Sequence, residues 1–317
     1  NREYAIKPMS CPGHIQIFNQ GIKSYKDLPI KLAEFGLVHR NEPSGTLHGL
    51  MRIRAFTQDD AHIFCTTNQI EKEIQNQIEN IYQIYEDFGF SNIKVELSTR
   101  PKLRVGDESI WDKSEESLKQ ALDSQKIDWS LNDGDGAFYG PKIDFSLKDS
   151  IGRIWQLGTI QLDFSMPTRL DAYFVNEKGD KENPVMIHRA ILGSLERFVG
   201  ILLEEYAGDL PLWLAPTQMV IMNITEKQEK PCTDLLKLLE THSFRPIMDL
   251  RNEKISYKIR EHTLKRIPYL VIIGDREASK NEVSIRTRSG EDLGSIKIED
   301  FISNIKELVA NKSRLLK

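Results

Sequence analysis

The spacing of apolar residues predicts helices and strands in two different orders along the chain. Between residues 68 and 88, apolar side chains recur at helical spacing, which predicts an amphipathic helix. In the same part of the chain, several apolar stretches separated by short breaks predict strands. These stretches are 51–57, 60–65, 141–147, 154–164 and 185–189. Strands that follow one another closely favour an antiparallel sheet over repeated βαβ units.

The order of elements changes after the segment GDLPLWLAPTQ at residues 208–218, whose glycine and two prolines predict a linker. Beyond it, predicted strands and helices alternate, which indicates a small α/β domain. The strands are 219–224, 244–250, 269–274 and 283–288, and the helices are 230–242, 255–266 and a last one from about 298. We therefore predict two domains, 1–210 and 211–317.

Composition is typical of a globular protein with a core, since 39% of the 317 residues are hydrophobic and 28% are charged. No apolar run approaches the roughly 18 residues that span a bilayer, and no secretory signal pattern is present. Three cysteines, Cys11, Cys65 and Cys232, are too few for a disulfide framework and indicate a reducing compartment. We therefore expect a cytoplasmic protein without membrane association.

Charge is spread unevenly, although the net charge is only −4. From Thr217 onward the chain holds 19 Lys and Arg against 15 Asp and Glu, whereas the preceding part holds 24 against 32. A basic C-terminal third on an acidic body indicates a polyanionic partner such as nucleic acid. Ordinary variation of surface charge is the alternative interpretation.

Three residues have the chemistry of a zinc site. Cys11 lies in KPMSCPGH, where the Pro-Gly pair predicts a turn, and His188 lies in an apolar strand. In TQDDAHIFC, Asp60 and His62 share one face of a predicted strand. Cys11, His62 and His188 would make a good zinc set with a fourth position open. Their spacing matches no recognised zinc pattern, so a surface strand or a satisfied core histidine remains an alternative.

Several arginines could bind phosphate groups. Arg40 and Glu42 lie at the end of a strand in HRNEPSG, Arg52 follows a loop, and Arg197 begins a helix in GSLERF. Guanidinium groups bind phosphate oxygens in a bidentate fork, so three converging arginines would hold a nucleoside triphosphate. Surface ion pairs are the alternative. Neither a P-loop nor a G-x-G-x-x-G pattern occurs, which argues against a standard Walker or Rossmann site.

These stretches resemble known motifs. RNE, a loop, then Arg52 and Phe56 resemble the second signature motif of class II aminoacyl-tRNA synthetases, and GSLERF resembles the third. Longer segments resemble bacterial-type threonyl-tRNA synthetases, through DLRNEKISYKIREHTLKRIPYLVIIGD and so over nearly the whole chain. They include KPMSCPGH, HRNEPSGTLHGLMRIRAFTQDDAHIF, GAFYGPKIDF, GTIQLDFSMP and VMIHRAILGSLERF.

The resemblance implies a fold. Residues 1–210 would form the class II catalytic domain, an antiparallel sheet flanked by helices, and 211–317 a small α/β anticodon-binding domain with a mixed sheet. The family's first motif, which forms the homodimer, and its editing domain would lie upstream of Asn1. Because the chain begins without Met in what reads as the middle of an element, we expect it to be a fragment.

The resemblance also implies an activity. The chain would use ATP to activate L-threonine as threonyl-adenylate and transfer it to the 3′ end of tRNA(Thr). One Zn²⁺ per subunit, held by Cys11, His62 and His188, would bind the amino group and hydroxyl of threonine, with the Pro-Gly turn aiming Cys11. Asp60 would bind the ammonium. Three further residues would shape the threonine pocket: Met9, Tyr139 and Gln161, with Gln58 as a weaker candidate.

For ATP, the resemblance implies two catalytic arginines. Arg40 would contact the α-phosphate, and Arg197 the γ-phosphate and one adenine face. The other expected ATP contacts are Glu42 to the adenine amino group, Phe56 stacked on adenine, Arg52, Gln156 and Thr159, with Lys142 a weaker candidate. Mg²⁺ would bridge the phosphates.

In the C-terminal domain, the resemblance implies residues that could read unstacked anticodon bases. The candidates are Asn252, Lys254, Glu277 and Arg286, for each of which a solvated loop or strand end is the alternative.

Two other functions remain open at this stage. One is a synthetase-like RNA-binding regulator with an inactive site, against which Arg40, Glu42, Arg197 and the metal set argue. The other is a sister class II enzyme for proline, serine or histidine, against which the zinc set and Asp60 argue. We assign a structural role to His14, Cys65 and Cys232.

Overall fold

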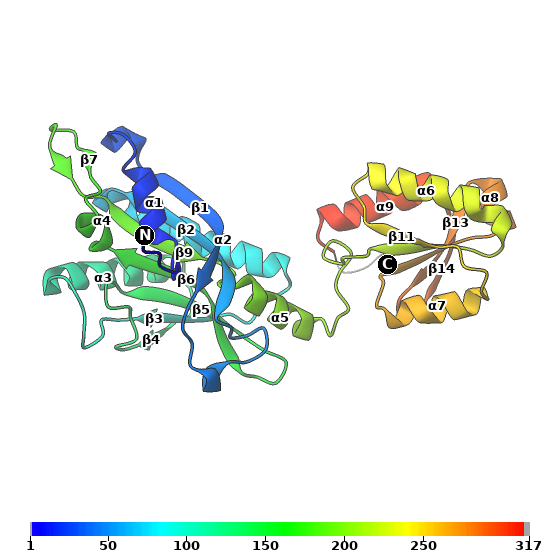
Figure 1. The fold of residues 1–317 in the computed structure, drawn as a ribbon, viewed down its shortest axis with the longest axis horizontal. Helices are drawn as coiled ribbons and strands as arrows, with labels where there is room; N and C mark the ends of the chain where they lie inside the picture. The colour runs from blue at the N-terminus through cyan, green and yellow to red at the C-terminus, as the bar shows by residue number, and fades with distance from the viewer. Residues whose placement is uncertain (1, 314–317) are drawn as a thin grey trace. The chain divides into compact units, whose positions relative to one another are not determined.

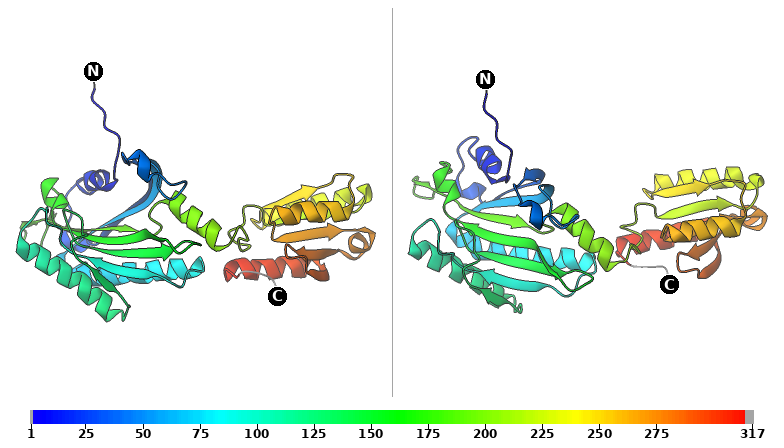
Figure 2. Two further views of the ribbon diagram at one scale, coloured as in Figure 1. Left: turned by 90° about the horizontal axis from the view of Figure 1, so that it is seen from below. Right: turned by 60° about the horizontal axis from the view of Figure 1, so that its bottom comes forward.

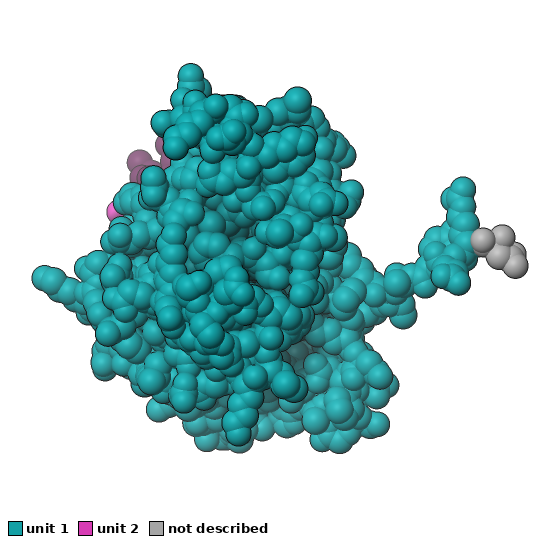
Figure 3. Space-filling model, turned by 90° about the vertical axis from the view of Figure 1, so that its left-hand side faces the viewer, with its two compact units in different colours: residues 1–204 teal, residues 205–317 magenta. Residues whose placement is uncertain are grey.

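The computed structural model describes residues 2–313 of the chain. The chain divides into two compact units, Asn1–Glu204 and Glu205–Lys317, which are coloured separately in Figure 3. Each unit has its own sheet (Figure 1). Within the described residues, no helix is both long enough and apolar enough to cross a membrane.

The first unit is built on a seven-stranded sheet with the order β1-β2-β9-β6-β5-β3-β4 (Figure 1). All neighbouring strands are antiparallel except β3 and β4, which are parallel. The antiparallel-rich sheet confirms the predicted class. The strands are β1 Ile30–His39, β2 Ala55–Cys65, β3 Lys94–Ser98, β4 Ser130–Asn132, β5 Lys142–Lys148, β6 Ile154–Asp163 and β9 Val185–Ala190, and a small hairpin adds β7 Phe174–Val175 and β8 Lys181–Glu182.

The two longest helices of the unit lie on one face of this sheet. Helix α2 (Ile70–Asp87) packs against β6, β9 and helix α3 (Glu108–Ser124), and Figure 2 shows both helices on one side of the sheet, opposite α1 (Cys11–Phe18). The predicted amphipathic pattern of α2 is confirmed, because its apolar stripe is buried; each such side chain stabilises the fold by about 1.5 to 3 kcal/mol. The stripe consists of Ile70, Ile74, Ile78, Ile81 and Tyr85.

The remaining helices of the unit are short. They are α4 Met166–Arg169, α5 Leu195–Glu205, and the 3₁₀ turns η1 Tyr25–Asp27, η2 Ser44–Thr46 and η3 Thr67–Gln69.

Two local predictions were wrong. The Pro-Gly pair after Cys11 is not a turn; it lies in the first turn of α1, where proline is tolerated because its missing N–H has no intrahelical partner. The predicted strand 51–57 begins only at Ala55, because a tight turn precedes it, in which the His48 N–H donates to the Arg52 carbonyl oxygen at 3.0 Å.

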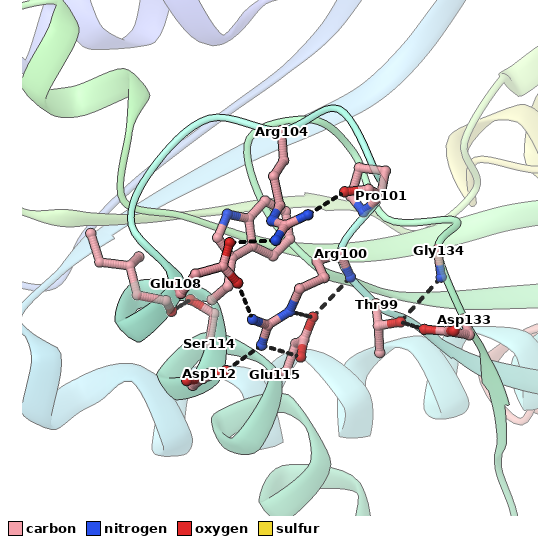
Figure 4. A network of polar contacts seen from close by, with 12 residues as sticks. Thr99, Arg100, Pro101, Arg104, Glu108, Asp112, Ser114, Glu115, Asp133 and Gly134 are labelled. Carbon is pink, nitrogen blue, oxygen red and sulfur yellow. Dashed lines mark hydrogen bonds and ion pairs between the residues drawn. The ribbon is translucent and has the colours of Figure 1, made fainter.

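An ion-pair network fixes the loop that follows β3 to helix α3 (Figure 4). The Arg100 guanidinium contacts Glu108 at 2.8 Å and Glu115 at 2.7 Å, and it also contacts Asp112. The Arg104 guanidinium contacts Glu108 as well. Single exposed ion pairs contribute little to stability, but one arginine held by three carboxylates orders a whole loop. Every charge in the network has a partner, so its role is structural.

The second unit is a small α/β domain with a mixed sheet, as predicted. Its strand order is β11-β10-β12-β13-β14, with the first three parallel and the last two antiparallel to their neighbours. Helices α6 and α9 pack on one face and α7 on the other (Figure 1). The strands are β10 Met219–Asn223, β11 Pro246–Asp249, β12 Tyr269–Ile273, β13 Glu282–Thr287 and β14 Asp292–Lys297; the helices are α6 Glu229–Thr241, α7 Ile255–Leu264, α8 Asp275–Lys280 and α9 Ile298–Ala310, with a 3₁₀ turn η4 Glu226–Gln228.

Candidate active site

A cavity of about 450 Å³ lies in the first unit. Its walls come from β2, β6, β9, the start of α1 and α5, and the loops after β1 and before β5. All the residues that the sequence predicted for metal, threonine and ATP binding line this one cavity. They are Met9, Cys11, Arg40, Glu42, Arg52, Phe56, Asp60, His62, Tyr139, Gln156, Thr159, Gln161, His188 and Arg197, joined by the weaker candidates Gln58 and Lys142.

Cys11, His62 and His188 form a buried cluster at one end of the cavity. Their ligand atoms all lie within 4.8 Å of one another, and within the described residues no other such group of histidine, cysteine and acidic side chains is found. His62 on β2 lies directly opposite His188 on β9, with 3.1 Å between His62 Nε2 and His188 Nδ1. Cys11 comes from the first residue of α1. One sulfur and two imidazole nitrogens form a donor set that fits zinc with a fourth position open.

The two histidines of the cluster lie in opposite electrostatic environments. Burial lowers the pKa of His62 to about 2, so its imidazole is neutral at pH 7, which is the state that binds a metal. Burial also acts to lower the pKa of His188, but hydrogen bonds with Asp163 and Cys11 outweigh burial and raise it to about 9. His188 Nε2 lies 2.9 Å from Asp163 Oδ2. Asp163 therefore favours positive charge at His188, whereas burial and the positive charge at His188 disfavour it at His62.

Asp60, Tyr139 and Gln161 surround this cluster. Asp60 follows the same strand face as His62, and its Oδ1 lies 3.8 Å from His62 Nε2. Burial raises the pKa of Asp60, opposed by the neighbouring His188. Gln161 on β6 is the register partner of His188, and the Tyr139 ring centroid lies 5.5 Å from the His188 ring. A nearly buried carboxylate beside the cluster is suited to an ammonium group.

The three arginines predicted from the sequence also line the cavity. Arg197 at the start of α5 donates from Nε to the Met51 carbonyl and from Nη1 to the Gln156 carbonyl, both at 2.7 Å. The Arg40 guanidinium lies 5.3 Å from the Phe56 ring centroid. Burial lowers the pKa of Arg197, and the positive charges of Arg52 and Arg40 lower it further, with only Glu42 opposing them. Arg52 pairs with Glu42 at 3.6 Å, so the positive charge of the three arginines is compensated only in part, which suits an anionic ligand.

A β-bulge brings Gln156 and Thr159 to the same face. Strict alternation along β6 would place these two residues on opposite faces. The register with β5 shifts beside Phe145 and Ser146, so that Leu157 is left without a partner. As a result, Gln156 Nε2 and Thr159 Oγ1 both donate to Asp144 Oδ1, the latter at 3.2 Å. Sequence alternation alone could not have predicted this shared position.

Asp59 holds the turn that presents Arg197. Its carboxylate accepts backbone hydrogen bonds from Ile191, Leu192 and Gly193 at 2.8 to 3.0 Å. Gly193 has φ +71°, and a Cβ there would lie 2.5 Å from the Leu157 carbonyl oxygen, so only glycine fits. Sequence reasoning did not single out Asp59, nor Asp163 behind His188. The only signals were a second aspartate beside Asp60 and the D of GTIQLDF.

The anticodon candidates of the second unit do not all lie together. Asn252 and Lys254 are exposed in the loop after β11, and Glu277 follows β12, so these three lie at the carboxyl edge of the parallel strands. Arg286 lies on β13 opposite Leu270, toward the start of β12. Glu277 accepts from the Gly274 N–H at 3.1 Å, and Arg286 pairs with Asp292 at 2.7 Å. Asn252 and Lys254 are the more freely presented pair.

Known families match both units. The class II tRNA synthetase core domain family (G, H, P, S and T) matches residues 1–206, and the anticodon-binding domain family matches residues 218–308. A threonine–tRNA ligase of Prochlorococcus marinus (strain MIT 9211) is 60% identical over 314 residues, which are 99% of this chain and 49% of the relative. The chain thus spans about half the length of this curated relative.

Solved structures have the same fold. The crystal structure described as the RNA-binding domain of threonyl-tRNA synthetase from Cryptosporidium parvum Iowa II is 41% identical, with a TM-score of 0.90. The match covers 98% of this chain and 77% of that one. A prolyl-tRNA synthetase from Cryptosporidium parvum, complexed with halofuginone and AMPPNP, is 22% identical with a TM-score of 0.70, over 97% of this chain and 59% of that one. The second likeness is one of fold alone.

Proposed function

Because the chain belongs to the class II aminoacyl-tRNA synthetases and, among them, to the threonyl-tRNA synthetase family, we propose that it activates L-threonine with ATP and transfers it to tRNA(Thr). One observation carries the proposal: a Cys-His-His cluster and three arginines line the same cavity. The Cys-His-His side chains are suited to hold a metal ion that binds a polar amino acid, and the arginines are suited to bind a nucleoside triphosphate. The 41% identity to a threonyl-tRNA synthetase, against 22% to a prolyl-tRNA synthetase, supports threonine over proline as the substrate.

At the threonine end, the buried donor set of Cys11, His62 and His188 would hold one Zn²⁺ per subunit, which would offer open coordination positions to the amino group and hydroxyl of threonine. Asp60 would bind the ammonium and so fix the orientation of the amino acid. Three further side chains would complete the pocket around its methyl and carboxylate groups: Met9, Tyr139 and Gln161. The carboxylate of threonine would thereby point along the cavity toward the arginines.

At the ATP end, Arg40 would bind the α-phosphate and stabilise the negative charge that develops as the threonine carboxylate attacks it. Arg197 would bind the γ-phosphate and stack on adenine, opposite Phe56. The remaining contacts would come from Glu42, Arg52, Gln156 and Thr159, with Mg²⁺ bridging the phosphates. Catalysis of this kind works by positioning and electrostatic stabilisation and needs no protein nucleophile.

The second unit would bind the anticodon of tRNA(Thr). Its mixed α/β fold presents Asn252 and Lys254 at the carboxyl edge of three parallel strands, where polar groups can reach unstacked bases. Glu277 and Arg286 complete the proposed set. Each would have to bond to a base in addition to its present partner, the Gly274 N–H for Glu277 and Asp292 for Arg286. Assembly as a homodimer and a cytoplasmic location complete the proposal.

ATP–pyrophosphate exchange with single amino acids tests the proposal. A site built to engage a hydroxyl rejects the analogue that lacks it by roughly 10⁴-fold or more, so valine should be almost inactive. Serine keeps the hydroxyl and lacks one methyl, worth about 1 to 3 kcal/mol, so it should be activated at a measurable rate. Valine exchange equal to serine exchange would show that the hydroxyl is not read. No exchange with any amino acid would favour an RNA-binding regulator, and exchange with proline alone a sister enzyme.

A further inference from the structure

His14 lies behind one of the metal-ligand candidates. It follows Cys11 by three residues on α1, so both side chains project from the same face of the helix. Its Nδ1 lies 2.7 Å from His62 Nδ1, and the two rings meet edge to face with centroids 4.8 Å apart. His14 is only 5% exposed, so this contact lies in the interior of the protein.

The positions of the nitrogens determine the direction of this hydrogen bond. His62 Nε2 faces His188, so its Nδ1 points away from the cluster. When Nε2 is a ligand, the single ring proton of neutral His62 is on Nδ1 and is donated to His14 Nδ1. His14 must then carry its own proton on Nε2, which lies 3.6 Å from Glu34 Oε1. Glu34 on β1 is in turn held 3.5 Å from Lys7 Nζ.

The second histidine of the cluster has a simpler arrangement of the same kind. His188 directs Nδ1 inward and Nε2 to the carboxylate of Asp163. His188 thus bonds directly to a carboxylate, whereas His62 bonds to the imidazole of His14, whose Nε2 lies near the Glu34 carboxylate. Partners of this kind fix the tautomer and the ring orientation of a metal ligand.

We propose that His14 and Glu34 form a relay of positioning residues that keeps His62 in the tautomer and orientation that bind the metal. This inference rests on the proposed function, since it concerns the same metal site. It gives a role to His14, for which the sequence had suggested only a structural position.

Zinc affinity of the whole chain, measured by competition with a chelator, tests the relay. His14→Leu removes the acceptor and should weaken zinc binding by about 10- to 100-fold, the usual cost of losing such a partner. His14→Asn has almost the same size as leucine but places a carbonyl oxygen near the position of Nδ1, and it should stay within about threefold of the unsubstituted chain. The d–d absorption spectrum of the Co²⁺-loaded protein should change with leucine and be restored with asparagine.

Two results would overturn the relay: unchanged zinc affinity in His14→Leu, or equal losses in the leucine and asparagine variants, which would indicate packing alone. If the leucine variant does not fold, Glu34→Ala at a partly exposed side chain replaces it, and unchanged affinity there has the same meaning. Failure of the metal site itself is a separate result. In that case the unsubstituted chain would bind no zinc, or Cys11→Ala would bind it normally.

Discussion

Each unit of this protein contains a buried histidine that is hydrogen-bonded to a buried aspartate, yet the two pairs belong to different kinds of cluster. His188 Nε2 lies 2.9 Å from Asp163 Oδ2 in the first unit, and His262 Nε2 lies 2.8 Å from Asp249 Oδ2 in the second. The first pair borders the cavity. The second is enclosed with Lys258, whose side chain is 1% exposed.

Most polar groups of the second cluster bond to one another. The Lys258 ammonium has three hydrogens, and three acceptors lie around it: Asn223 Oδ1 at 2.9 Å, the Asp249 carbonyl at 3.2 Å and the Asn223 carbonyl at 3.3 Å. Arg251 pairs with the Asp249 carboxylate at 2.7 Å. Lys258 and Arg251 therefore have partners within the protein, although His262 Nδ1 is buried without a hydrogen-bond partner.

The polar groups of the first cluster converge on one point: His62 Nε2 lies 3.1 Å from His188 Nδ1, and Cys11 also hydrogen-bonds His188. Cys11, His62 and His188 direct three ligand atoms toward one region and lie within 4.8 Å of each other. Their remaining hydrogen bonds run outward, to Asp163 and His14. The direction of the donor atoms, rather than residue type or burial, distinguishes a candidate ligand site from a structural polar cluster.

The largest expected effect is the loss of metal from the first cluster. Cys11→Ala removes one of three ligands, so the zinc content of the purified chain should fall from about one ion to near zero. Cys65→Ala is the matched control, because Cys65 is also a buried cysteine but faces the core from β2. Elemental analysis measures both. Full zinc occupancy in Cys11→Ala would show that the first cluster is not the metal site, and the two clusters would no longer differ in kind.

The next effect concerns arginines that converge on the cavity. Arg40→Ala and Arg197→Ala should each lower the rate of threonyl-adenylate formation by roughly 10²- to 10³-fold, the cost of losing one preorganised donor to a transition state. Arg251→Ala is the control, because Arg251 belongs to the self-contained cluster and should change that rate by less than about threefold. Rapid-quench measurement of the adenylate compares them. A larger loss of adenylate formation in Arg251→Ala than in Arg40→Ala and Arg197→Ala would contradict the assignment of ATP binding to the cavity.

Periodicity and chemistry in the sequence predicted much of this comparison. The apolar stripe of α2, the antiparallel order of the first sheet and the alternating second unit all follow from local patterns. The residues that line the cavity could be predicted because they lie in motifs that resemble those of a known enzyme family.

Other features depend on contacts between segments that are distant in the chain. The bulge in β6 reverses the face of Gln156, and the bond of His14 with His62 joins residues 48 positions apart. Asp59 and Lys258 acquire their partners only through the fold. Sequence gives the residue types at these positions, but not the directions in which their polar atoms point.

A smaller effect is expected at the edge of the second sheet, where polar groups are presented to solvent. Asn252→Ala and Arg286→Ala should weaken tRNA binding by about 1 to 3 kcal/mol each, roughly 5- to 150-fold, as for the loss of a side chain that reads a base. Pyrophosphate exchange with threonine should not change, because neither residue lines the cavity. Filter binding of tRNA measures the first quantity.

Lys306→Ala, at an exposed lysine of α9, is the control for general electrostatic attraction. A loss of threonine exchange as large as the loss of tRNA binding would contradict the assignment of anticodon contacts to the second unit.

The last effect is expected inside the self-contained cluster, and it is one of stability rather than of activity or binding. Lys258→Met keeps the aliphatic stem but leaves Asn223 Oδ1 and the Asp249 carbonyl oxygen without their donor, which should cost about 1 to 3 kcal/mol. Hydrogen exchange followed by mass spectrometry on the whole chain should show faster exchange in β10, β11 and β12, with β2 and β9 unaffected. Lys265→Met is the control, because this exposed lysine directly follows α7, and it should change hydrogen exchange very little.

Zinc content and threonine activation should stay at the level of the unsubstituted chain in Lys258→Met, because the second cluster directs most of its polar atoms at one another. Lys258→Met would contradict this assignment if it lowered tRNA binding without changing hydrogen exchange. The second cluster would then be a binding site too, and the convergence of polar atoms would not distinguish a ligand site from a structural cluster.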